Sequence, residues 1–265
     1  MRIVVCVKEV LDPDAVNNYA LAGNLTIGDD GKTLQVSAIP QIMNGFDEQA
    51  MEAALKIRDS GLDCTICAVS IGPNQKSLLK HCAALGADET VAIDADLGAL
   101  DSQVTANILC AYINSSGGAD LILCGRQASD DDQGVVPALI GEILGLPIAP
   151  LARAIEVSDS TLTVTRATPD GDEIVQGATP AVVTISNELG DPRFPTAKGK
   201  MAARKKKPTQ VAIGDLGLSP EQLTPRIVLN RQYVPQVQGN CEFIDGTPAE
   251  AARALIDKLR QDSLI

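Results

Sequence analysis

The chain has 265 residues, a net charge of −12 and a hydrophobic content of 45%, enough for one large α/β domain or a smaller domain with an extension. An acidic chain lacks the basic excess that neutralises nucleic-acid phosphates, and no apolar run is long enough for a membrane span or a signal peptide. Nucleic-acid binding and membrane insertion are therefore not expected. Aromatic residues make up only 2%, so a stacked cofactor would need rings from a second chain.

The seven cysteines are an odd number and lie mostly in apolar stretches, which is typical of reduced thiols in a cytoplasmic protein. Cys64 and Cys67 form a CxxC spacing, but in a strand-like run residues three apart point to opposite faces. This favours a structural role, and no metal site is expected. His81, the single histidine, has no partner at the spacing of a triad, so no catalytic side chain is indicated.

The first half of the chain alternates short apolar runs with amphipathic stretches. The expected strands are residues 3–7, 64–71, 90–93 and 120–124, and the expected helices are 44–58, 74–84 and 102–113. Asn44 is expected to cap its helix, and the polar residues 17–40 are expected to form an excursion. This alternating β/α series predicts a doubly wound, mostly parallel sheet with helices on both faces.

One loop stands out after the fourth expected strand. Residues 125–136 read Gly-Arg-Gln-Ala-Ser-Asp-Asp-Asp-Gln-Gly-Val-Val and lead into a helix. In an open parallel sheet such a loop lies where ligands bind, and its free N–H groups favour a phosphate. Residues 130–132 would repel a phosphate unless their carboxylates bond to the loop's own N–H groups or to a ribose, which leaves Ser129, Gln133 and Gly134 for the phosphate. A solvated acidic N-cap cluster is the simpler alternative, slightly favoured on local grounds.

The pattern changes after Pro147. Residues 162–166 and 173–176 flank a Pro-Asp-Gly-Asp turn and predict a small β-hairpin, and residues 181–185 predict another buried strand. A loop rich in proline and glycine follows, and it ends in a basic run at 204–207. This run is either a solvated helix end or a docking site for an acidic partner.

From residue 209 the composition is that of a linker, and an amphipathic helix at 247–259 ends the pattern, with Thr247 as N-cap and Pro248 in the first turn. So long an arm before one helix has little use in a monomer. We therefore expect an α/β nucleotide-binding domain at 1–208, with a partner-recognition loop near 186–201. Residues 209–265 are expected to form an extended C-terminal arm and a helix that packs on another subunit.

Several motifs resemble the beta subunit of electron-transfer flavoprotein, in that family's order and spacing. They are residues 3–8, the helix start at 44–55, Gly86-Ala87-Asp88, the loop from Gly125, residues 180–184, Asp191-Pro192-Arg193-Phe194 and Lys205-Lys206-Lys207. The resemblance implies an adenine-nucleotide-hydrolase-like fold and a heterodimer with an alpha subunit, on which the C-terminal arm packs. It also implies FAD shared with that subunit and an acyl-CoA dehydrogenase-type partner, so the protein would be an electron carrier rather than a self-contained enzyme.

The resemblance further implies which residues form the sites. The beta subunit of the family buries AMP or, in electron-bifurcating members, a second FAD; the triplet at 130–132, without a Gly-Thr pair, favours AMP. The cofactor-binding residues would be Cys6, Asn44, Gly45, Phe46, Asp47, Ile71, Gly125, Arg126, Gln127, Ala128, Ser129, Asp130, Asp131, Asp132, Gln133, Gly134, Val135 and Val136. The partner-binding residues would be Leu189, as an exposed apolar anchor, with Pro192 and Arg193.

Three functions remain open from the sequence. The first is an electron carrier that exchanges electrons with acyl-CoA-type dehydrogenases through FAD. The second is an electron-bifurcating flavoprotein that oxidises NADH with a second FAD in this subunit. The third is a stand-alone adenine-nucleotide sensor or hydrolase, against which the missing Walker-type loop and its lysine count.

Overall fold

The structure is a computed structural model that describes residues 1–35, 38–234 and 241–265. It divides into two units, Met1–Gln232 and Tyr233–Ile265. Residues 209–232, expected in the arm, thus belong to the first unit. The reason is that the strand β11 (Thr209–Val211) pairs in parallel with β5 (Glu89–Ile93) at the edge of the main sheet.

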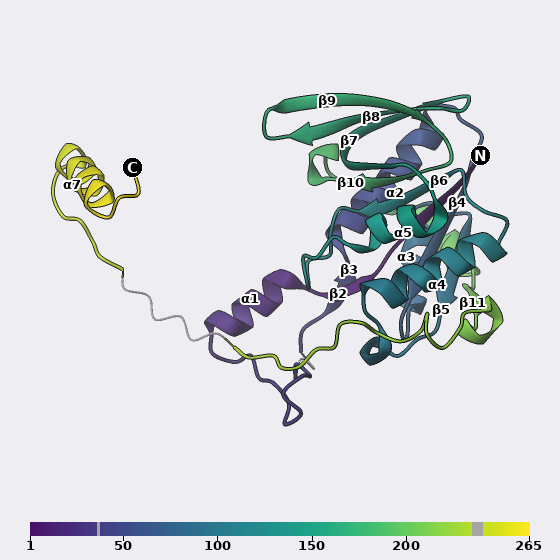
Figure 1. The fold of residues 1–265 in the computed structure, drawn as a ribbon, viewed down its shortest axis with the longest axis horizontal. Coiled ribbons are helices and arrows are strands. Elements are labelled where there is room, and N and C mark those ends of the chain that lie inside the picture. Colours follow the sequence, from purple (N-terminus) through teal and green to yellow (C-terminus); the bar gives the residue numbers. More distant parts are fainter. Residues whose placement is uncertain (36–37, 235–240) are drawn as a thin grey trace. The chain divides into compact units, whose positions relative to one another are not determined.

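The first unit is built on a nine-stranded sheet in the order β11-β5-β4-β1-β6-β10-β7-β8-β9 (Figure 1). The remaining parallel strands are β1 (Arg2–Cys6), β4 (Thr65–Ile71), β6 (Leu121–Gly125), β7 (Ile148–Ser158) and β10 (Ala181–Ile185). Two antiparallel strands, β8 (Thr161–Thr168) and β9 (Gly171–Ala178), extend the sheet from β7. The expected α/β fold with a mostly parallel sheet is confirmed, and the expected hairpin is joined to that sheet.

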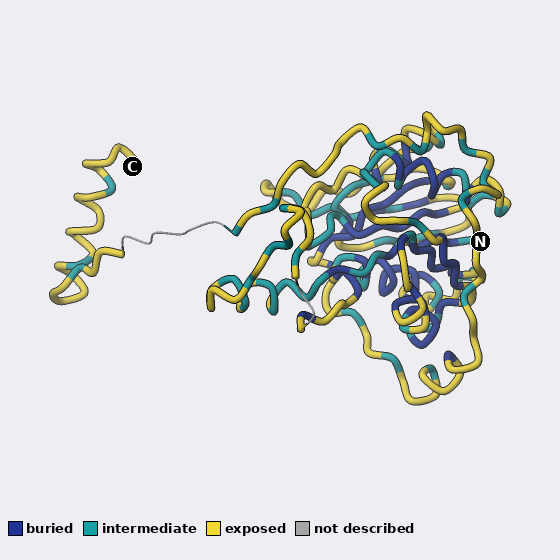
Figure 2. The backbone as a smooth tube through the Cα atoms, turned by 90° about the horizontal axis from the view of Figure 1, so that it is seen from below, coloured by how far each residue is buried: buried dark blue, intermediate teal, exposed yellow. Residues whose placement is uncertain are grey.

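Helices cover both faces of the sheet. The helices α2 (Gly45–Asp59) and α3 (Lys76–Leu85) lie on one face, and α4 (Ser102–Ser115) and α5 (Val136–Leu144) lie on the other; the short α6 (Ala197–Ala203) packs on α3. Because successive strand residues point to opposite faces, Ile3 and Val5 join the α2 side of the core and Val4 joins the α4 side. Burial is concentrated in the sheet and the inner faces of these helices (Figure 2).

The segment between β1 and α2 holds more structure than the sequence predicts. A separate two-stranded sheet pairs β2 (Glu9–Leu11) with β3 (Gln41–Met43), and the helix α1 (Pro13–Leu21) follows β2. The Asp12 carboxylate caps α1 by accepting hydrogen bonds from two backbone amides. None of the residues of α1 is buried, so apolar periodicity gives no signal for this helix. Residues 36–37 of the expected excursion lie outside the described residues.

The second unit contains the helix α7 (Pro248–Gln261). Thr247 and Glu250 form a reciprocal capping box at its start, which confirms the expected helix and its cap. No residue of α7 is buried, and its packing on another subunit stays a prediction. Residues 235–240 of the expected arm lie outside the described residues. No helix in the described parts of the chain has both the length and the apolar character needed to cross a bilayer.

Candidate functional site

The sheet changes its direction of growth between β1 and β6. From β1 the chain adds β4 and β5 on one side, and it then returns to add β6 and β10 on the other. At such a switch point the connecting loops diverge, and a crevice opens beyond the carboxyl ends of the strands, where ligands bind in this class of fold. A cavity of about 510 Å³ lies there, within the roughly 300–1,000 Å³ typical of small-molecule sites.

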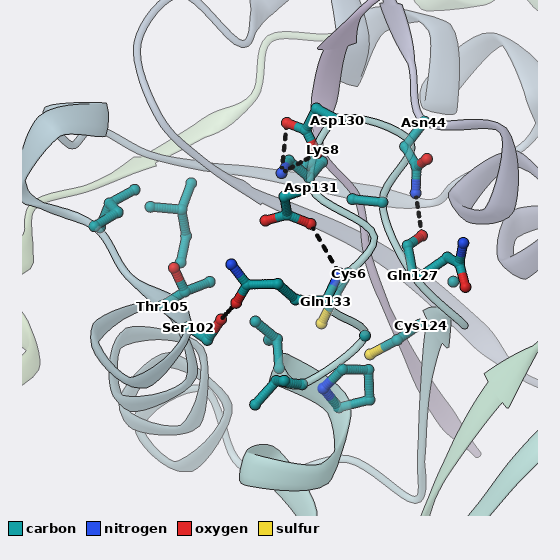
Figure 3. Close-up of a pocket in the computed structure, with 18 of the residues that line it drawn as sticks. Cys6, Lys8, Asn44, Ser102, Thr105, Cys124, Gln127, Asp130, Asp131 and Gln133 are labelled. Atoms are coloured by element: carbon teal, nitrogen blue, oxygen red, sulfur yellow. Dashed lines mark hydrogen bonds and ion pairs between the residues drawn. The ribbon is translucent and has the colours of Figure 1, made fainter. Parts of the chain in front are cut away.

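The cavity brings together most of the predicted cofactor residues (Figure 3). Those that line it are Cys6, Asn44, Asp47, Ile71, Gly125, Gln127, Ala128, Asp130, Asp131, Gln133, Gly134, Val135 and Val136. The predicted residues outside the lining are Gly45, Phe46, Arg126, Ser129 and Asp132. Of these, Arg126 lies over the ring of Phe46, with its guanidinium carbon 5.3 Å from the ring centre.

The cavity also has lining residues outside the expected cofactor-binding set. Lys8 lies two residues beyond the end of β1, and Ser102 and Thr105 belong to the first turns of α4. Ile227 and Leu229 come from the segment after the 3₁₀ helix η3 (Ile213–Leu216). A position just after a central strand could have pointed to Lys8, whereas no local pattern points to the segment at 227–229.

Asp101 explains why that distant segment reaches the cavity. One carboxylate oxygen accepts hydrogen bonds from the amides of Arg226 and Ile227, at 2.6 and 3.0 Å. The other oxygen accepts from the amide of Val104 at 2.8 Å and so caps α4. These bonds lower the pKa of Asp101 despite its partial burial. One side chain therefore joins the start of α4 to a wall of the cavity.

Asn44 holds the loop at 125–136 from the opposite side. Its side-chain nitrogen donates to the carbonyl oxygen of Gln127 at 2.9 Å, and its Oδ1 accepts from the amide of Ser129 at 3.2 Å. Asn44 is only 1% exposed, and its side chain makes no capping bond to α2. Asn44 is the N-cap residue of α2, as expected, but its side chain makes no capping bond because both polar atoms are used to fix the loop.

Asp47 joins the ends of the two central strands. Its carboxylate accepts hydrogen bonds from the amides of Lys8 at 2.9 Å and Gly125 at 3.2 Å. Burial raises the pKa of Asp47 to about 7, although these bonds oppose the shift. Residue 125 must be glycine, because a Cβ there would lie 2.5 Å from Oδ1 of Asp47 and 2.8 Å from the backbone of Phe46.

The three aspartates of the loop are all bonded within the chain. Asp130 forms an ion pair with Nζ of Lys8 at 2.9 Å, and Asp131 accepts a hydrogen bond from the amide of Gln133 at 3.3 Å. Asp132 accepts from the side-chain nitrogen of Gln127 at 2.8 Å. Loop N–H groups or a ribose were the expected partners of all three; Asp131 uses a loop N–H group, and the other two use side chains of the chain.

Two groups of loop amides have no acceptor. Among the described residues, they are the amides of Gln127, Ala128 and Asp130 early in the loop and those of Gly134, Val135 and Val136 at the start of α5, whereas those of Ser129 and Gln133 are occupied. Of the three residues expected to hold a phosphate, Gly134 therefore has a free amide, and Ser129 and Gln133 do not. Gly134 has a φ of +62°, and a Cβ there would lie 2.8 Å from the carbonyl oxygen of Arg126. Free amides at a helix start form a ready anion site.

Comparisons with known proteins identify the family. The chain matches the family described as "Electron transfer flavoprotein domain" over residues 33–216. This chain belongs to the electron transfer flavoprotein family. It is 34% identical to "Caffeyl-CoA reductase-Etf complex subunit CarD" of Acetobacterium woodii, over the whole of both chains. It is 32% identical to "Electron transfer flavoprotein subunit beta" of Clostridium acetobutylicum and to "Acryloyl-CoA reductase electron transfer subunit gamma" of Anaerotignum propionicum, again over the whole of each chain.

Within the electron transfer flavoprotein family the chain is therefore beta-like, as its motifs predicted. The predicted partner-binding residues of this subunit lie in and after the 3₁₀ helix η2 (Asn187–Leu189). Leu189 is only 9% exposed and packs in the core with residues of α2. The expected exposed anchor is thus wrong at this position, because η2 turns the side chain inward. Nζ of Lys56 on α2 also donates to the carbonyl oxygen of Leu189 at 3.0 Å.

Arg193 holds the loop after η2 against α2. Its guanidinium donates to both carboxylate oxygens of Glu52 at 2.7 and 2.9 Å, and it pairs with Asp59 at 2.7 Å. Glu52 is 5% exposed, and the hydrogen bonds to its carboxylate raise the pKa of Arg193. The next residue, Phe194, is 91% exposed. The exposed apolar side chain of the loop is therefore Phe194.

Proposed function

We propose that this chain is the beta subunit of a heterodimeric electron transfer flavoprotein and that its switch-point cavity holds an adenine nucleotide. The observation that carries the proposal is the group of unbonded amides at Gly134, Val135 and Val136, which line the cavity at the start of α5. Their partial positive charge suits a phosphate. The repulsion from the neighbouring carboxylates is reduced in part, because Asp130 is paired with Lys8 and the other two accept hydrogen bonds within the chain.

The other walls of the cavity suit the rest of the nucleotide. Val69, Ile71 and Cys6 form an apolar floor at the ends of β4 and β1, which suits the faces of an adenine ring. Ser102 and Thr105 present hydroxyl groups from α4, and Ser102 donates to Oε1 of Gln133 at 3.0 Å. These hydroxyls are placed to bond a ribose. The nucleotide is AMP or the adenosine end of a second FAD, and the triplet at 130–132 favours AMP.

The electron-carrying FAD is shared with an alpha subunit in this proposal. That flavin supplies the redox chemistry when bound, and the protein supplies its position and surroundings. This chain has three phenylalanines, three tyrosines and no tryptophan, so a second chain is needed to enclose a flavin ring. The amphipathic helix α7, which buries none of its residues here, is the element that would pack on the alpha subunit.

The proposed redox partner is an acyl-CoA dehydrogenase-type enzyme. Two relatives are named as electron-transfer parts of a caffeyl-CoA reductase complex and of an acryloyl-CoA reductase, which supports a partner that acts on CoA esters. Docking would use the loop near 186–201 through Phe194, since Leu189 is buried and Arg193 is engaged with α2. The basic residues at 204–207 would flank this contact.

A second candidate is an electron-bifurcating flavoprotein that oxidises NADH with a second FAD in this cavity. The same two relatives favour it, because their names place them with reductases, to which electrons are passed. Both candidates use the same amides, and they differ in what the cavity holds.

The test is to purify the chain with a co-expressed alpha subunit and to identify the released cofactors by mass spectrometry. One FAD and one AMP per heterodimer is the expected result, and reduction by a CoA-ester dehydrogenase should bleach the flavin. Two FADs with rapid bleaching by NADH would select the bifurcating function. A colourless heterodimer without nucleotide would contradict both.

A further inference from the structure

We propose that Lys8 is the side chain that binds the phosphate of the nucleotide, and that Asp130 competes with this phosphate for the Lys8 ammonium group. The inference deepens the proposed function and depends on it. It concerns a residue that lies in the motif at 3–8 but was not among the expected cofactor-binding residues. Figure 3 shows the pair at one end of the cavity, with the Lys8 ammonium bonded to the carboxylate of Asp130.

Lys8 differs from the other charged residues of the cavity wall in the sign of its charge. Among the described residues that line the cavity, Lys8 is the one with a cationic side chain. The lining also carries five carboxylic acids, Glu9, Asp47, Asp101, Asp130 and Asp131. A phosphate that enters this cavity meets a predominantly acidic surface, so the single ammonium group decides whether anions or neutral ligands are preferred.

Asp130 differs from the other aspartates of the lining in the kind of group to which its carboxylate bonds. Asp47, Asp101 and Asp131 accept hydrogen bonds from backbone amides, which fix the fold and are not exchanged when a ligand binds. Asp130 instead bonds to a lysine side chain at 2.9 Å. Among the four aspartates of the lining, it is therefore the one whose bond a ligand could replace.

The backbone of Lys8 is held in place while its side chain is free to turn. Its amide donates to Asp47 at 2.9 Å, and its carbonyl oxygen accepts from the amide of Asn44 at 3.0 Å. The side chains of Lys8 and Asp130 are 42% and 39% exposed, and ion pairs of that exposure contribute little to stability. The flexible lysine stem can therefore exchange one carboxylate for a doubly charged phosphate at small cost.

The exchange predicts opposite effects of two substitutions. The affinity of nucleotide-free heterodimer for AMP and for adenosine is measured by calorimetry in wild type, Lys8→Gln, Asp130→Asn and the double variant. Lys8→Gln should weaken AMP binding about tenfold, because a charge-assisted bond is lost, and should leave adenosine binding unchanged. Asp130→Asn should tighten AMP binding about threefold, because the competing charge is removed. The double variant should behave like Lys8→Gln.

The control is Lys76→Gln, which removes a lysine outside the cavity lining and should bind both ligands as wild type does. Titration with FAD in parallel shows whether the phosphates of AMP or of FAD depend on Lys8. An unchanged ratio of AMP to adenosine affinity in Lys8→Gln, with normal AMP binding by wild type, would overturn the role of Lys8 alone. Wild type that binds neither AMP nor FAD would overturn the proposed nucleotide site, and with it this inference.

Discussion

Two loops that follow neighbouring strands are both fixed by α2, and they turn their residues in opposite directions. The loop after β6 is held at the start of α2 by Asn44 and Asp47, and its residues face a cavity. The loop after β10 is held further along α2 by Glu52, and it leaves Phe194 in solvent. One helix thus supports both the loop that lines the cavity and the loop that exposes Phe194.

A polar side chain within an otherwise apolar helix face can hold a loop that is distant in sequence. Glu52 and Asp47 are buried among core residues of α2, where an unpaired charge would be costly. Each is satisfied by a loop that follows in the chain by many residues. Substitutions in either loop should therefore affect one function and leave the other intact.

The largest expected effect is on the inward-facing loop. Gly134→Ala should remove most bound nucleotide, because its Cβ would lie 2.8 Å from the carbonyl oxygen of Arg126 and would displace the free amides. Gly145→Ala is the matched control, since residue 145 has a similar φ of +64° and no atom within 4 Å of the added Cβ. The measurement is nucleotide per heterodimer after purification. Equal loss in both variants would show that backbone strain alone is responsible.

The second largest effect is expected for Arg193→Ala, which removes the attachment of the loop after η2 to α2 and should lower the free energy of unfolding. It leaves Glu52 buried without its cation, and loss of one partner of a buried ion pair costs about 3 kcal/mol. The free energy of unfolding in urea measures this, and nucleotide content should stay normal. The control is Arg153→Ala, which breaks the exposed pair with Asp172 and should cost about 0.5 kcal/mol. A similar cost in both variants would show that the Arg193–Glu52 pair stabilises the fold no more than an exposed pair does.

Leu189→Ala and Phe194→Ala should affect different properties of the protein. The first truncates a buried side chain and should lower the free energy of unfolding by about 2 kcal/mol. The second truncates an exposed side chain, so stability should hold while electron exchange with a CoA-ester dehydrogenase slows. Stopped-flow flavin reduction at several partner concentrations measures the exchange. Normal exchange in Phe194→Ala would remove this residue from the docking surface.

The effect of Asp47→Asn should depend on pH and should be small near neutral pH. An asparagine can accept only with its oxygen, so one of the two amides loses its partner, at a cost of about 1 kcal/mol near neutral pH. The raised pKa of Asp47, about 7, means that the folded chain binds an extra proton between about pH 4 and 7. This contribution to stability is full at pH 4 and is lost as the pH rises to 7. Asp47→Asn should lack that slope in urea unfolding, and an equal slope would argue against the shift.

The strands and the ligand loop could be predicted because their signals are local. The apolar runs of β1, β4 and β6 and the chain order β/α fix where the loop at 125–136 lies. The partner of Asp130 could not be predicted, because Lys8 and Asp130 are 122 residues apart in sequence. Leu189 was misplaced for a related reason: flanking glycine and proline indicate a loop, and they do not indicate which way its side chains turn.

The wall formed by residues 227 and 229 has a consequence for assembly. The second unit begins at Tyr233, only a few residues beyond this wall. In the proposed heterodimer, an alpha subunit bound to the end of this chain would restrict movement of residues 227–229. It would therefore slow dissociation of the proposed nucleotide from the cavity. Cofactor exchange should then be fast in the isolated chain and slow in the heterodimer, which makes loading before pairing the productive order.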